Sequence, residues 1–171
     1  MARKERVQKT NAMRELERGG VAYTVVTYDT TNEDLSTGVG VRISEMLGED
    51  PDSAFKTLVT TTPSGGHVTC CIPVAEELDL KKAAAAAGEK TLQMMHVRDL
   101  EPTTGYVRGG CTPVGMKKQF PTLIDETAQL FDEISISGGR RGLSLTVNPE
   151  ELAHFLDATF ADIVRDDRAS L

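Results

Sequence analysis

Several short segments have the composition of strands and predict a sheet, and apolar and polar positions alternate along residues 143–147. Most of their residues are β-branched or aromatic, as is typical of strands. The clearest candidates are residues 23–28, 55–61, 67–73, 134–137 and 143–147, with shorter ones at 91–94 and 123–125. The turn Pro-Ser-Gly-Gly at residues 63–66 predicts a β-hairpin. Because neighbouring strand residues face opposite sides, Cys70 and Cys71 are expected on different faces of the sheet.

Apolar residues at helical spacing, together with capping residues, predict helices between the strands. The expected helices are residues 11–18, 39–47, 80–87 and 150–156, with short helical turns at 97–100 and 126–131. Thr10 and Asp79 are suited to begin two of these helices, and Gly19 and Gly88 are suited to end the same two.

The order of these elements predicts the fold class. Strands and helices do not alternate in a regular β-α-β repeat, and a polar loop with Asn32, Asp34 and Ser36 follows the first strand. The pattern therefore predicts an α+β protein rather than a doubly wound parallel sheet. A chain of 171 residues is expected to form a single domain over residues 1–171.

The distribution of charge indicates an anionic ligand held at one place. The net charge of -7 argues against a protein that coats duplex nucleic acid. Cations nonetheless gather in two glycine-rich segments, residues 104–122 and 138–142, whereas acids concentrate elsewhere, as in residues 45–52 and 125–133. This asymmetry is compatible with a local cationic site on an acidic protein.

Metal and membrane chemistry have no support in the sequence. The 3 cysteines lack C-x-x-C spacing and the 3 histidines form no metal-binding pattern, so we expect reduced thiols and no metal. No apolar run approaches the roughly 20 residues that span a bilayer, and the charged N-terminus is unlike a secretory signal. We therefore expect a cytoplasmic protein without a membrane partner.

Two features leave a structural and a functional interpretation open. Lys56 lies in an apolar strand candidate, where it can face solvent or bind an anion inside a pocket. The glycine-rich segments can be surface turns, or can bring backbone N–H groups to a ligand. Neither matches a P-loop or a dinucleotide-binding motif. Because no G-x-S-x-G elbow is present and no cysteine has a nearby histidine to pair with, an enzyme of this sequence is expected to act by positioning its substrate.

An ordered set of motifs carries a resemblance to a known family. The motifs are VVTYDT with Tyr28, FKTLV with Lys56, and residues 74–82, 104–110, 113–118, 121–125 and 136–143. Each alone is unspecific, but the set resembles the YbaK/EbsC family of aminoacyl-tRNA deacylases, relatives of the editing domain inserted in bacterial prolyl-tRNA synthetases. The resemblance extends from about residue 10 to about residue 162.

The resemblance implies a mixed-sheet, barrel-like core with flanking helices and an enzyme that acts in trans. The implied reaction removes a mischarged amino acid, most typically cysteine, from tRNA(Pro), through attack of the substrate's own thiol on the ester. No cofactor and no metal are implied. The implied partners are the acceptor end of mischarged tRNA and prolyl-tRNA synthetase. The alternative is a non-catalytic module that binds tRNA ends or a nucleotide and associates with prolyl-tRNA synthetase.

The resemblance also implies roles for residues of this chain. The expected catalytic residues are Lys56, Tyr28, Gly109 and Gly110, the glycines through their backbone. Expected substrate-binding residues are Thr112, Pro113, Ser137, Gly138, Gly139, Arg140 and Ser144. Contacts to tRNA are expected from Arg108, Lys117, Lys118 and Arg141. The chain departs from the usual family residues at Cys111-Thr112 and at Ser144, where many relatives have Asp, and either departure can change which aminoacyl group fits.

Overall fold

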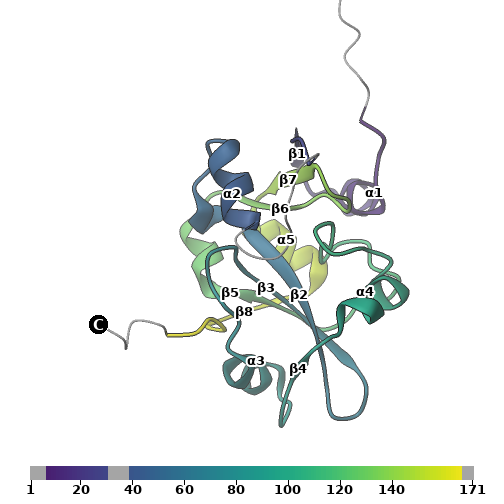
Figure 1. Ribbon diagram of the computed structural model, residues 1–171, viewed down its shortest axis with the longest axis vertical. Helices are drawn as coiled ribbons and strands as arrows, with labels where there is room; N and C mark the ends of the chain where they lie inside the picture. The colour runs from purple at the N-terminus through teal and green to yellow at the C-terminus, as the bar shows by residue number, and fades with distance from the viewer. Residues whose placement is uncertain (1–6, 31–38, 167–171) are drawn as a thin grey trace, which may run out of the picture.

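The computed structural model describes residues 7–30 and 39–166, which form two β-sheets flanked by helices (Figure 1). The polar loop expected at Asn32, Asp34 and Ser36 lies outside the described residues. The predicted α+β class is confirmed, because the sheets mix parallel and antiparallel pairs. Among the described residues, no helix has the length and apolar character needed to cross a membrane.

The smaller sheet is antiparallel and has the strand order β1 (Tyr23–Thr27), β7 (Leu143–Val147) and β6 (Ile134–Ser137). Leu143, Leu145 and Val147 are buried and share one face of β7. This apolar face fixes the register, because a shift by one residue would expose all three side chains. Just beyond β1, the Tyr28 N–H donates to the Gly142 carbonyl at 3.0 Å, which places Tyr28 beside the β6–β7 turn.

The larger sheet has the strand order β4 (Gln93–Met94), β2 (Phe55–Thr61), β3 (His67–Pro73), β5 (Thr122–Asp125) and β8 (Thr159–Ala161). Strands β2 and β3 form the predicted hairpin with the predicted bounds, whereas β3–β5 and β5–β8 are parallel pairs. The sheets meet where Ala54, just before β2, forms a bridge with Ser135 in β6. The start of β2 therefore lies beside the smaller sheet.

One edge of β2 is only partly paired. Strand β3 covers one edge from Phe55 to Thr61, whereas β4 pairs with the other edge only at Thr60 and Thr61. Between Phe55 and Leu58, this second edge has no strand partner among the described residues, apart from the bridge at its start. Backbone groups on an unpaired edge are available to another molecule.

The helices are α1 (Asn11–Arg18), α2 (Val39–Met46), α3 (Leu80–Ala87), α4 (Val97–Thr104) and α5 (Pro149–Leu156), with the 3-10 helices η1 (Pro51–Ser53) and η2 (Glu126–Leu130). The predicted caps of α1 and α3 are confirmed. The Thr10 hydroxyl accepts from the Met13 N–H at 3.3 Å, and the Asp79 carboxylate accepts from the N–H groups of Lys81 and Lys82 at 3.0 Å. These bonds satisfy N–H groups that have no partner within the helix.

Helix α4 extends further than the predicted turn at residues 97–100. It continues through Pro102 to Thr104, although proline removes one helical hydrogen bond. The last turn stays closed because the Thr104 hydroxyl donates to the Leu100 carbonyl at 2.7 Å and the Gly105 N–H donates to the Glu101 carbonyl at 2.8 Å. The proline therefore does not end the helix.

Two core clusters pack on opposite faces of the larger sheet. Cys71 and Ile124 belong to the cluster shared with the smaller sheet, α1 and α5. Cys70 and Leu123 belong to the cluster shared with α3. The prediction that Cys70 and Cys71 face opposite sides is thus confirmed, and both thiols are buried.

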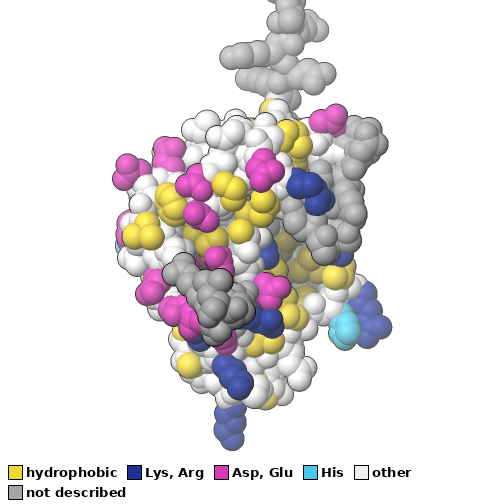
Figure 2. Space-filling model, turned by 60° about the vertical axis from the view of Figure 1, so that its left-hand side comes forward, with side chains coloured by type: hydrophobic (Ala, Val, Ile, Leu, Met, Phe, Trp, Pro, Cys, Tyr) yellow, Lys and Arg dark blue, Asp and Glu magenta, His cyan; other side chains and the backbone are white. Residues whose placement is uncertain are grey.

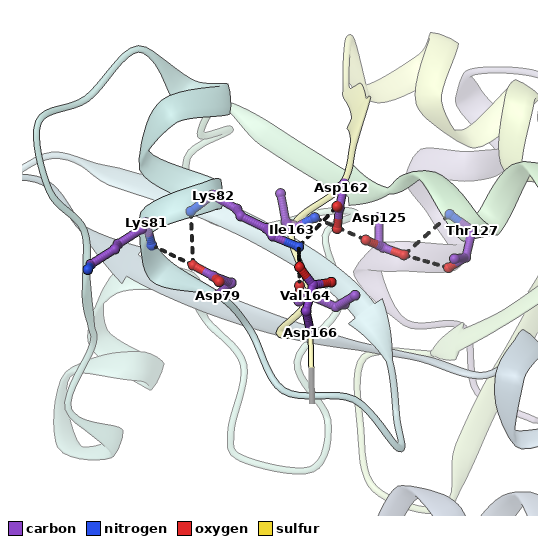
Figure 3. Close-up of polar contacts among 9 residues, drawn as sticks. All are labelled: Asp79, Lys81, Lys82, Asp125, Thr127, Asp162, Ile163, Val164 and Asp166. Carbon is purple, nitrogen blue, oxygen red and sulfur yellow. Dashed lines mark hydrogen bonds and ion pairs between the residues drawn. The ribbon is translucent and has the colours of Figure 1, made fainter. Parts of the chain in front are cut away.

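Polar contacts hold the chain after β8 against β5 and α3 (Figure 3). The buried Asp125 carboxylate, at the end of β5, accepts from the Ile163 N–H at 3.1 Å and from the N–H and hydroxyl of Thr127. At the same junction, the Lys82 ammonium donates to the Asp162 carboxylate at 3.0 Å. Strand β8, which no sequence pattern predicted, is held in place by these contacts.

Candidate active site

A cavity of about 450 Å³ lies where the two sheets meet. It is lined by the open edge of β2, by α2, by β6 and β7, and by the segments around Tyr28 and Gly109. Much of the wall is apolar, with Ile43, Val74 and Leu143 among its residues. In Figure 2, hydrophobic side chains lie in a hollow near the centre of the face shown, and acidic side chains are scattered over the same face. Apolar walls with a few polar groups are typical of a small-ligand site.

Lys56 lines this cavity from β2 and is half-buried. Burial lowers the pKa of its ammonium group, and the charges of Glu77 and Glu76 oppose this shift. In the part of the chain that the structure describes, the ammonium has no hydrogen-bond or ion-pair partner. The nearby Glu77 carboxylate is instead paired with Arg165 at 2.7 Å. A partly desolvated cation of this kind gains from an anionic ligand.

Seven of the residues proposed from the sequence line the cavity together. They are Tyr28, Lys56, Arg108, Gly109, Ser137, Arg141 and Ser144. Arg108 and Arg141, expected to contact tRNA, are exposed, so they extend from the cavity wall to the surface. These seven positions come from four separate stretches of the chain, which the fold brings to one place.

The two glycine-rich segments pack against each other. A Cβ atom on Gly110 would lie 2.8 Å from the Arg140 Cα, and one on Gly139 would lie 3.2 Å from the Tyr106 ring. Gly109 has φ +86° and lines the cavity, whereas the Gly110 N–H donates a hydrogen bond to the Val107 carbonyl at 2.9 Å. Of the two expected backbone donors, only Gly109 lies at the cavity. Gly110 instead allows the two glycine-rich segments to approach each other closely.

The other proposed residues do not line the cavity. They are Gly110, Thr112, Pro113, Lys117, Lys118, Gly138, Gly139 and Arg140. Gly138 lies inside the β6–β7 turn, where its N–H donates to the Leu143 carbonyl at 2.9 Å and its carbonyl accepts from Thr10 at 2.6 Å. Thr112 is fully buried, and its hydroxyl has no partner among the described residues. Lys118 is exposed, away from the cavity.

Glu49 lines the cavity and was not among the residues proposed from the sequence. Burial raises the pKa of its carboxyl group, while a hydrogen bond with Ser135 acts in the opposite direction. The Ser135 hydroxyl also contacts the Ser144 hydroxyl at 2.5 Å, and Ser144 donates to the Ile136 carbonyl at 3.2 Å. Glu49 lies in an acidic stretch, residues 45–52, which resembles a solvated surface in the sequence. Asp50 and Asp52 share this place between α2 and β2, so the sequence carries no signal that singles out Glu49.

Cys111 reaches the cavity but belongs to a third core cluster with Tyr106 and Phe120. Burial raises the pKa of its thiol to about 12. The thiol is therefore protonated near neutral pH, which is the opposite of what a nucleophilic cysteine requires. Among the described residues, no group of three or more His, Cys, Asp or Glu side chains is arranged to hold a metal ion.

The fold and this cavity define a class of protein: an α+β binding domain in which a desolvated lysine and glycine backbone meet an apolar cavity. The sequence model of the aminoacyl-tRNA editing domain matches residues 41–155, and the chain belongs to this family. It is also 45% identical over 163 residues to a protein of Enterococcus faecalis named "Putative Cys-tRNA(Pro)/Cys-tRNA(Cys) deacylase EbsC". The match covers 95% of this chain and 98% of that protein, and it confirms the family resemblance carried by the motifs.

Two solved structures share the fold over most of the chain. One is described as "a putative trans-editing enzyme for prolyl tRNA synthetase", with a TM-score of 0.79 and 23% identity over 91% of this chain and 95% of that chain. The other is the "hypothetical protein APE2540", with a TM-score of 0.81 and 20% identity over 91% of this chain and 100% of that chain. At these identities the likeness concerns the fold.

Proposed function

We propose that the protein is a deacylase that acts in trans on mischarged tRNA and removes cysteine from tRNA(Pro). The chain belongs to the aminoacyl-tRNA editing family, and one observation carries the proposal. Lys56, which has no direct partner among the described residues, lies with Gly109 in a cavity whose walls are largely apolar. The nearly full-length relative named as a Cys-tRNA(Pro)/Cys-tRNA(Cys) deacylase supports the same reaction.

The chemistry follows from what the cavity contains. Its thiol, Cys111, is protonated near neutral pH, so a nucleophile supplied by the substrate fits the site better than one supplied by the protein. The substrate's thiol attacks the ester carbonyl, a C–S bond forms, the C–O bond to the ribose breaks, and the thiol proton passes to the ribose oxygen. The products are a cyclic thiolactone and free tRNA. A well-oriented intramolecular attack lowers the barrier by roughly 7 to 11 kcal/mol.

Each proposed group then has a physical task. Lys56 binds the terminal phosphate, which compensates the burial of its ammonium. The backbone of Gly109 stabilises the negative charge that develops on the ester oxygen, and Tyr28 limits the pocket. Arg108 and Arg141 meet the phosphates of the acceptor end. Because the net charge of -7 disfavours tight binding of tRNA by the protein alone, recruitment by prolyl-tRNA synthetase would help it to reach its substrate.

The test is a deacylation panel over tRNA(Pro) charged with cysteine, alanine or proline, with protein at catalytic concentration. We expect fast loss of cysteine with the wild type and a fall in kcat/KM of about 100-fold or more in Lys56→Ala, in line with the loss of one stabilising donor. Lys81→Ala, which removes an exposed lysine of α3, serves as the control and should retain full activity.

Two outcomes would contradict the proposal. The first is a wild type that does not accelerate loss of any amino acid, and the second is an unchanged rate in Lys56→Ala. Binding of a 3′-adenosine analogue without turnover of any mischarged tRNA would instead support the non-catalytic binding module.

A further inference from the structure

Glu49 is the only carboxylate among the described residues that line the cavity. The acidic residues near it in the sequence behave differently. Glu45 is exposed, and Asp50, also exposed, caps η1 by accepting from the Asp52 N–H at 2.9 Å. Glu49 is half-buried and reaches the cavity wall formed by Ser135. Its side chain is therefore separated from the solvated acidic surface of the neighbouring segment.

The hydroxyl groups beside Glu49 do not saturate its carboxylate. Three contacts form a chain: Glu49 with Ser135, Ser135 with Ser144, and Ser144 with the Ile136 carbonyl. The two serine hydroxyls supply only two protons for these three contacts, because an ionised carboxylate supplies none. A carboxylate has about four acceptor sites, so most of the acceptor capacity of Glu49 remains open.

Burial of the Glu49 carboxylate costs free energy, and a cationic ligand would offset this cost. It raises the pKa of the Glu49 carboxyl group, which means that burial disfavours the charged form of this group. The other charged side chains that line the cavity are the cations Lys56, Arg108 and Arg141, and none of the three forms an ion pair with Glu49. An ammonium group on a ligand would both supply donors and offset the desolvation of the carboxylate.

The aminoacyl end of tRNA carries such a group. It combines phosphate anions on the nucleotide side of the ester with one α-ammonium on the acyl side. We propose that Glu49 binds the α-ammonium of the aminoacyl ester and thereby positions the acyl group against the Lys56 side of the cavity, an inference that rests on the deacylase function proposed above. Glu49 is a positioning residue in this scheme, because the bond changes occur at the ester and the substrate thiol.

The first test compares Cys-tRNA(Pro) with its N-acetyl form, which keeps the ester and the thiol but lacks the ammonium. Wild-type kcat/KM should be about 10-fold to 100-fold higher for the free amine, the range that a charge-assisted hydrogen bond produces. Glu49→Gln keeps the size and the ability to contact Ser135, and it should lose this preference while leaving the N-acetyl rate unchanged. Glu45→Gln, an exposed carboxylate of α2, should behave as the wild type.

Equal losses on both substrates would overturn the proposal, because a general base or a purely structural role affects the two forms alike. Ser135→Ala separates the roles further. It removes the hydroxyl contact but not the carboxylate, and the amine preference should persist. Loss of the preference in Ser135→Ala with retention in Glu49→Gln would contradict the assignment.

A binding measurement keeps this inference separate from the deacylase function. The probes are short acceptor-stem RNAs that end in 3′-alanylamino-3′-deoxyadenosine or in its propanoylamino counterpart, which lacks only the amino group. Neither amide can be hydrolysed like the ester. Calorimetry should show about 10-fold or tighter binding of the amine form to the wild type and equal binding of both forms to Glu49→Gln. Equal binding of both probes to the wild type overturns the Glu49 proposal, whereas absent turnover of every tRNA overturns only the deacylase proposal.

Discussion

At the scale of single residues, burial determines how the groups at the cavity react. It lowers the pKa of the Lys56 ammonium, raises the pKa of the Glu49 carboxyl, and raises the pKa of the Cys111 thiol to about 12. Each shift favours the uncharged form. For Lys56 and Glu49 a ligand of opposite charge reverses this effect, whereas the Cys111 thiol simply remains a small packing group.

The thiol chemistry of Cys111 can be tested by alkylation. A thiol with a pKa of about 12 is ionised to roughly one part in 10,000 at pH 8, compared with about a quarter for an ordinary cysteine. We expect the native protein to react with iodoacetamide far more slowly than the unfolded chain. The Cys111 rate, followed by peptide mass spectrometry, should rise about tenfold per pH unit from pH 8 to pH 10 without a plateau. A plateau near pH 8.5 would contradict the buried, protonated thiol.

At the scale of secondary-structure elements, Asp125 connects β5, η2 and the segment after β8. Replacing it with Ala would leave the buried Ile163 N–H without its acceptor and remove the cap of η2. We expect the free energy of unfolding to fall by about 2 to 5 kcal/mol, measured by urea denaturation. Asp162→Ala, which removes a half-exposed partner of Lys82, should cause a much smaller loss. Equal effects of the two changes would mean that Asp125 does not anchor this junction.

At the scale of the whole molecule, local signals predicted the elements better than their arrangement. The β2–β3 hairpin was predicted with its bounds, since its turn and both strands lie within one short stretch. The parallel pairing of β5 with β8 was not predicted, because the two strands are distant in sequence and β8 has only 3 residues. The division into two sheets that meet at one bridge also depends on distant contacts, which no local pattern reports.

The residues of the cavity were also predicted only in part, because motifs are local and the arrangement of the wall is not. Lys56 and Gly109 were proposed from motifs, and the structure places both at one cavity. Thr112 and Gly138 belong to neighbouring motif positions but are packed behind the wall, because only part of each glycine-rich segment reaches the cavity. Glu49 was missed because the sequence does not reveal which member of an acidic run turns inward. Motifs thus locate the segments of a site, while packing selects the side chains that a ligand meets.

The charge of the whole molecule predicts how binding to tRNA depends on salt. The net charge is -7, and the cations that line the cavity are Lys56, Arg108 and Arg141. Each phosphate contact on a single strand contributes about -0.7 to the slope of log K against log salt, so we expect a slope of about -2 for an RNA that ends in CCA. Fluorescence titrations between about 50 and 200 mM salt would measure it.

Arg108→Ala should reduce the magnitude of the slope by about 0.7 and weaken binding to tRNAs of any sequence, whereas Lys81→Ala should leave the slope unchanged. An unaltered slope in Arg108→Ala would place the phosphate path elsewhere. A wild-type slope beyond about -5 would require a much larger basic surface than these three side chains provide.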